Sequence, residues 1–159
     1  MVSWAQSWTD VQGMRRNHVG VELGGVMQLY GMSFERMTLG NMYHKLNVRL
    51  GTSYMPFEDY WESGDKALFV SLGLNYLWGE VHHLEVGINA RTGFYFQEPE
   101  NDSSEILRAL SPSIGYRFED FTKRSPYISV SFSPLYHYDH DALSWEFKPW
   151  GRLGIGYSF

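Results

Sequence analysis

The chain has 159 residues, which suits a single domain, and it contains no cysteine, so disulfide and thiolate chemistry are excluded. A formal net charge of -5, without a basic stripe of interleaved aromatics, argues against a nucleic-acid partner. No apolar run approaches the roughly 18 to 20 residues that a transmembrane helix needs. A strand that alternates apolar and polar residues escapes that test, because its mean hydropathy stays near that of a soluble protein.

The first 17 residues show no clean periodicity. Ser3-Trp4-Ala5 has the small-x-small form of a signal-peptidase site, but the basic and apolar regions that should precede such a site are missing. We interpret residues 1–17 as an N-terminal periplasmic tail, a short plug or a signal-peptide remnant. An ordinary flexible tail explains them equally well.

From His18 onward apolar and polar residues alternate, as in strands with one apolar face. Gly24 and Gly25 supply the positive-φ positions of a tight hairpin, although residues 18–37 also fit one bent strand. Turn-forming residues divide the rest of the chain. The pattern predicts eight strands, at 18–24, 26–37, 44–54, 66–78, 83–96, 106–118, 126–136 and 145–159.

The connections between these strands alternate in length. Those after the second, fourth and sixth strands are brief, and those after the third, fifth and seventh are longer and polar or acidic. Aromatic residues gather at both ends of the strands, with aliphatic residues between them. Short turns, long loops and two aromatic girdles are typical of outer-membrane barrels. The sequence therefore predicts an all-β, eight-stranded antiparallel transmembrane up-and-down β-barrel over residues 18–159, in the bacterial outer membrane.

Charged residues occupy the polar face of the predicted strands. A soluble barrel would bury these charges in its core, at several kcal/mol each unless they were paired. With the apolar face outward they point into a lumen, which in an eight-stranded barrel is narrow enough for side chains to fill. We expect a charge network and no open pore. Its predicted members are Glu22, Glu35, Lys45, Arg49, Glu85, Arg91, Arg117, Glu146, Lys148 and Arg152.

Several stretches resemble a known family, the small outer-membrane barrels of the Bacteroidota type, with an OmpA/OmpX-like architecture. They are Tyr-Gly-Met-Ser-Phe-Glu-Arg at 30–36, Leu-Gly-Leu-Asn-Tyr-Leu-Trp-Gly at 72–79, His-Leu-Glu-Val-Gly at 83–87 and Leu-Gly-Ile-Gly-Tyr-Ser-Phe at 153–159. Glu35 and Arg36 match a Tyr-x-Arg-like strand end, where Phe34 replaces the commoner Tyr. The resemblance covers residues 18–159 and implies architecture without an assigned chemistry. The last stretch resembles an insertion signal, made of Gly154, Gly156, Tyr157 and Phe159, which implies recognition by the barrel-assembly machinery.

The function expected from these features is that of a non-enzymatic structural or accessory subunit of an envelope complex. Its expected partners are outer-membrane lipid, lipopolysaccharide and other outer-membrane proteins, with no cofactor. The acidic loops suit divalent-cation bridges to lipopolysaccharide phosphates, although solubility explains their charge more simply. Phe57, Tyr60 and Trp61 form the candidate partner-binding loop, because exposed aromatics often anchor interfaces; they also suit the membrane surface.

Two alternatives stay open. The first is a narrow channel or carrier for small solutes, which requires the lumen charges to line a path. The second is a lipid A-modifying enzyme built from the loop-side residues His137, Asp139, His140, Asp141 and Ser144. Lipid A deacylases place a Ser two residues after the catalytic His, a pattern that neither His137 nor His140 meets. The same His and Asp residues suit Zn²⁺ or Mn²⁺, but we interpret them as a solvated loop and predict no metal site.

Overall fold

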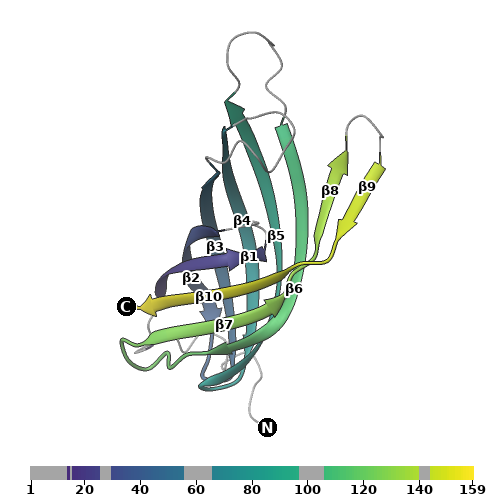
Figure 1. The fold of residues 1–159 in the computed structure, drawn as a ribbon. Helices are drawn as coiled ribbons and strands as arrows, with labels where there is room; N and C mark the ends of the chain where they lie inside the picture. Colours follow the sequence, from purple (N-terminus) through teal and green to yellow (C-terminus); the bar gives the residue numbers. More distant parts are fainter. Residues whose placement is uncertain (1–13, 15, 26–29, 56–65, 97–105, 140–143) are drawn as a thin grey trace.

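The computed structural model describes residues 14, 16–25, 30–55, 66–96, 106–139 and 144–159 (Figure 1). Its strands are β1 (Asn17–Gly24), β2 (Tyr30–Gly40), β3 (His44–Met55), β4 (Lys66–Trp78), β5 (His82–Phe96), β6 (Ile106–Phe118), β7 (Pro126–Phe132), β8 (Leu135–Asp139), β9 (Ser144–Lys148) and β10 (Gly151–Ser158). Within the described residues, no helix is long and apolar enough to cross a membrane.

The strands form a closed antiparallel ring. Hydrogen-bonded neighbours run in the order β5-β4-β3-β2-β1-β10-β7-β6, and β6 pairs again with β5. The remaining two strands lie outside this ring order: β8 follows β7 along the chain and β9 precedes β10, each across a break. The protein is therefore an all-β, eight-stranded antiparallel barrel, which confirms the predicted fold class.

Both breaks occur at a proline. Pro134 separates β7 from β8, and Pro149 lies between β9 and β10. Proline lacks the N–H that a central strand must donate, so it interrupts the ladder; one bond survives there, from Ser133 N to Trp150 O at 2.8 Å. The prediction of unbroken strands at 126–136 and 145–159 is therefore wrong. Strict alternation with Phe132 and Tyr136 would place Pro134 on the outward face, but this residue is buried.

The β8-β9 hairpin departs from the barrel wall. Its ladder to β6 consists of Ala109↔His137 and Leu110↔Tyr136, and Figure 1 shows the hairpin splayed beside the upper part of the barrel. The closed part of the wall is therefore the half nearer the C-terminus, where β1, β10 and β7 complete the ring.

The first hairpin consists of two strands and not one bent strand. Gly24 and Gly25 have φ angles of 76° and 66°, the left-handed region that glycine enters without steric strain, as predicted. The second strand runs on to Gly40, whereas the sequence predicted a turn from Thr38. A register shift between Met37 and Leu39 lets the strand continue.

Burial is inverted relative to a soluble protein. Outward-facing side chains such as Leu72, 57% exposed, are apolar, whereas inward-facing ones such as Arg49, 0% exposed, are polar or charged. Along β2 and β7 exposed and buried residues alternate strictly over most of the strand, as the period-2 pattern predicts. The core of this barrel is therefore polar and its outer surface is apolar.

Candidate functional site: the charged lumen

One ion pair crosses the lumen from β6 to β2. Arg117 Nη1 lies 2.6 Å from Glu35 Oε2, and Arg117 Nε lies 2.6 Å from Glu119 Oε2. Asn47 Nδ2 and Asn75 Nδ2 donate to the two Glu35 oxygens at 3.2 and 3.5 Å. Glu35 thus receives hydrogen bonds from three strands. Its buried negative charge is stabilised by the positive charge of Arg117 and by directed hydrogen bonds from two asparagine amides.

Two further arginines bind carboxylates on other strands. Arg49 of β3 pairs with Glu22 of β1, and Arg152 of β10 pairs with Glu85 of β5. Arg152 Nε also donates to Ser131 Oγ at 3.1 Å. Neither Arg–Glu pair joins neighbouring strands of the ring, so both ion pairs connect strands that the backbone ladder does not link directly. The Arg152–Ser131 bond, by contrast, joins the neighbours β10 and β7.

Glu119 lies among three basic side chains, those of Arg117, His18 and His83, at the short-turn end of the barrel. It follows Phe118, the last residue of β6, and its Oε1 lies 2.6 Å from His18 Nδ1, while its backbone oxygen lies 3.0 Å from His83 Nε2. Burial works to raise the pKa of this carboxyl, but the Arg117 charge and the hydrogen bond with His18 hold its pKa below the ordinary value. Glu119 is therefore ionised at neutral pH although its side chain is fully buried.

An apolar cluster closes the lumen below these charges. Met37, Leu77 and Phe121 are buried together, and Met14 packs against them from the N-terminal segment. The ammonium group of Lys45 lies 4.9 Å from the Phe121 ring centre and donates to the backbone oxygen of Gly79 at 2.8 Å. Side chains therefore fill this end of the barrel.

The loop-side half of the lumen holds fewer charged side chains than the short-turn half. The Arg91 guanidinium lies 4.5 Å from the Phe69 ring centre, a cation–π contact. Ala109 and Leu135 form a small buried cluster, against which Trp150 packs. Buried serines complete this part of the interior; they include Ser53, Ser71, Ser111 and Ser133.

Tyr127, near the start of β7, is buried in the lumen beside two glycines. A Cβ added at Gly20 would lie 2.2 Å from the Tyr127 hydroxyl, and one added at Gly156 would lie 2.3 Å from its ring. The Arg117 guanidinium covers the ring at 4.0 Å. The absence of side chains at positions 20 and 156 therefore makes room for the phenol.

The structure places eight of the ten predicted network residues in the buried interior. They are Glu22, Glu35, Lys45, Arg49, Glu85, Arg91, Arg117 and Arg152. Glu146 and Lys148 do not join them: they pair with each other at 3.3 Å with side chains 49% and 43% exposed. The prediction for these two was wrong because it extended the inward face past Pro149, onto a hairpin that leaves the wall.

Sequence reasoning missed four interior residues. His18 and His83 begin predicted strands but were given no role, while Glu119 was assigned to a turn. Tyr127 shares the inward face of β7 with Ser129 and Ser131, so strict alternation was the available signal for it. Nothing local signalled Glu119, because a residue beyond a strand end follows no period.

The remaining predicted sites divide between described and undescribed residues. Gly154 and Gly156 lie on the inward face of β10, and Tyr157 and Phe159 are exposed on its outer face. Their role as an insertion signal stays a prediction. The candidate partner-binding residues Phe57, Tyr60 and Trp61 lie outside the described residues, as do most residues of the acidic loops.

The candidate enzyme residues fall on the splayed hairpin. His137 and Asp139 belong to β8, where Asp139 pairs with Ser144 of β9; His140 and Asp141 lie outside the described residues. Across the part of the chain that the structure describes, no group of three or more His, Asp or Glu residues could hold a metal ion.

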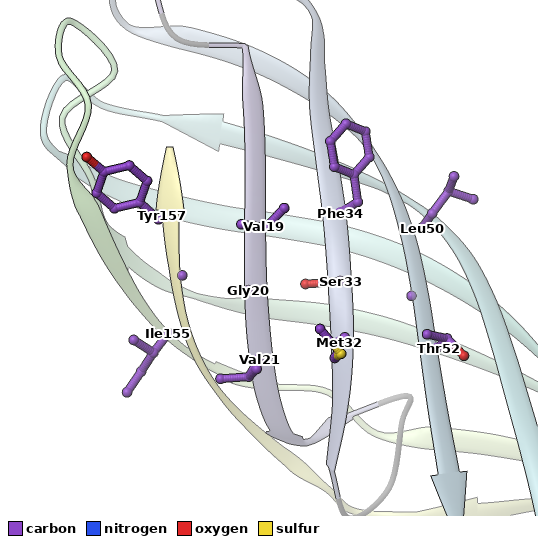
Figure 2. A pocket seen from close by; sticks show the side chains of 12 residues that line it. Val19, Gly20, Val21, Met32, Ser33, Phe34, Leu50, Thr52, Ile155 and Tyr157 are labelled. Atoms are coloured by element: carbon purple, nitrogen blue, oxygen red, sulfur yellow. The ribbon is translucent and has the colours of Figure 1, made fainter. Parts of the chain in front are cut away.

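Apolar grooves cross the outer surface formed by the described residues. The first, of about 640 Å³, lies across β10, β1, β2 and β3 (Figure 2). Its outward side chains are Val19, Val21, Met32, Phe34, Leu50, Thr52, Ile155 and Tyr157. The second, of about 500 Å³, lies across β3 to β6. Both grooves lie on the wall and not in the lumen.

Comparisons with protein-family models, curated proteins and solved structures found no match to this chain. The class of protein is therefore defined by the fold alone: an eight-stranded antiparallel β-barrel, an architecture compatible with small outer-membrane barrels.

Proposed function

We propose that this chain is an integral protein of the bacterial outer membrane, a non-enzymatic barrel that acts as a structural or accessory component of the envelope. The observation that carries the proposal is the inverted distribution of side chains, with apolar residues outside and polar or charged residues inside. In water such an outer surface would far exceed the apolar patches that monomeric proteins expose. In a bilayer the same surface is satisfied by lipid.

The ends of the wall support this placement. Trp78, Tyr116 and Phe118 are exposed toward the short-turn end, and Tyr54 and Phe94 toward the loop end. Aromatic rings favour the two membrane interfaces, where their apolar bodies meet the acyl chains and their polar atoms meet the headgroups. We also propose, from the sequence motifs, that the protein is a barrel of the Bacteroidota type.

We further propose that the lumen does not conduct. Arg49 and Arg117 are 0% and 1% exposed to a water-sized probe, and their partners lie on non-adjacent strands across the interior. A water-filled path would leave such side chains exposed. At this level the ion pairs occupy the cross-section.

Reconstitution in planar bilayers tests both halves of the proposal. Heat-modifiable migration on gels and resistance to urea extraction from vesicles would demonstrate membrane insertion. Inserted protein is expected to give no sustained conductance; discrete channels would replace the filled-lumen model with the narrow-channel alternative. Failure to insert at all would overturn the proposed location.

Two comparisons of cells with and without the protein address its role. Unchanged lipid A masses are expected, and a lost acyl chain would instead identify a lipid A-modifying enzyme. Purification from native membranes in mild detergent tests the accessory role. A stoichiometric outer-membrane partner is expected to co-purify, and its absence would leave a stand-alone barrel.

A further inference from the structure

We propose that the outer surface of β3 to β6 binds a phosphorylated acyl lipid of the outer leaflet. In this site Arg108 holds the phosphate and the adjacent groove holds an acyl chain. The inference rests on the proposed outer-membrane location, and it assigns a particular lipid site to this surface.

The groove is built from outward-facing apolar side chains of four strands. Those that line it are Leu50, Val70, Leu72, Ala90 and Leu110, together with Trp145 of β9. Ala90 is the shortest of them and is flanked in the ladder by Leu72 and Leu110, so it forms the floor. A volume of about 500 Å³ lies within the range of small-molecule pockets.

Arg108 lies at the rim of this groove and is exposed on the outer face of β6. Ten residues separate it from Phe118 at the short-turn end, about 33 Å along the strand and about 25 Å along the axis at a tilt near 40°. That is the full height of the apolar band in this class of barrel. The guanidinium therefore reaches the opposite interface, at the level of the lipid phosphates.

The surroundings of Arg108 favour an anion. Arginine on a lipid-facing surface strongly destabilises a barrel at the bilayer midplane but hardly at all near the interface, so the charge is tolerated at this height. A guanidinium binds phosphate through two parallel hydrogen bonds. Thr92 is the directly opposite residue on β5, and its hydroxyl supplies another donor on the same face. The described residues that line the groove include no carboxylate.

The first groove provides an internal comparison. Its lining contains no charged side chain (Figure 2), so it suits acyl chains without selecting a phosphate. The groove over β3 to β6, by contrast, combines an apolar floor with a cation at the loop-side boundary.

Native mass spectrometry of the detergent-purified barrel tests this site. The probes are bisphosphorylated lipid A and its fully dephosphorylated form, added at equal concentrations. The wild type is expected to retain the phosphorylated form at least tenfold better. Arg108→Gln should abolish that preference, and Arg36→Gln, which removes an outward arginine from β2, should preserve it. Equal retention by the wild type and Arg108→Gln would overturn the assignment.

Ala90→Trp tests the acyl half of the site. The substitution should weaken binding of phosphorylated and dephosphorylated lipid A alike, because the indole would fill the groove. Unchanged binding would show that the acyl chain lies elsewhere. Inorganic phosphate at millimolar concentration should not displace the lipid, and complete displacement would reduce the site to a simple anion site.

Heat-modifiable migration of every variant separates folding from binding. A wild type that never inserts into vesicles refutes the proposed location, whereas an inserted barrel whose lipid preference ignores Arg108 refutes only this inference.

Discussion

Arg117 and Glu35 meet at 2.6 Å although their strands lie opposite each other in the ring. Four ladder steps separate β6 from β2 in either direction, so no backbone hydrogen bonds relate the two residues. Their contact spans the barrel and fixes its cross-section at this level. Both side chains are buried, so loss of either leaves a charge without its main partner.

Arg49→Ala is expected to lower the free energy of unfolding by about 3–5 kcal/mol, because it removes one member of a buried ion pair. Its guanidinium pairs with Glu22 and lies 3.9 Å from Glu35. Urea titration of the barrel in vesicles measures the effect. Lys123→Ala is the matched control, since its pair with Asp120 is exposed and should contribute less than about 1 kcal/mol. Equal midpoints for both variants would contradict a stabilising inner network.

Arg91 and Phe69 are expected to be energetically coupled through their contact at 4.5 Å. The single variants Arg91→Ala and Phe69→Leu, with the double variant, form a double-mutant cycle in urea unfolding. A coupling free energy of about 0.5–2 kcal/mol is expected for a cation–π pair at this degree of burial. Additive effects would mean that Arg91 stabilises the barrel through its other contacts.

Gly20→Ala is expected to destabilise the barrel by about 1–3 kcal/mol, the usual effect of overpacking a filled interior. The new methyl group would meet the Tyr127 hydroxyl at 2.2 Å. Tyr127→Phe removes that oxygen and should restore part of the stability when combined with Gly20→Ala. A double variant no more stable than Gly20→Ala alone would place the strain elsewhere, for example at the Ile155 backbone oxygen 3.0 Å away.

Glu119 is expected to make stability depend on pH in the acid range. Its folded-state pKa is lowered, because Arg117 and His18 outweigh the effect of burial. The carboxylate therefore contributes fully above the pKa of an unfolded glutamate, and its contribution is lost as the pH falls through the lowered folded-state pKa. Urea midpoints measured from pH 7 to pH 3 should fall less steeply for Glu119→Gln than for the wild type. Parallel curves would show that other carboxylates control acid unfolding.

The alternation of residue types along the chain was enough to predict most of the architecture. Val19, Val21 and Leu23 on one side, with His18 and Glu22 on the other, define a strand and its two faces without knowledge of neighbours. Long and short connections then imply antiparallel order. The two strand breaks at Pro134 and Pro149 were harder to predict. A proline interrupts a strand only where a neighbouring strand would have accepted a hydrogen bond from the N–H that it lacks, and the sequence does not show which strands are neighbours.

By itself, the sequence determined the strands, the polarity of each face and the inward position of eight charged residues, since side-chain direction in a strand follows from a local period of two. Only the tertiary structure decided which charges meet. The pairing of Arg117 with Glu35, and the arrival of Glu119 beside His18 from beyond the end of β6, depend on the tilt and stagger of eight strands closed into a ring. Those quantities belong to the whole barrel, so no local pattern encodes them.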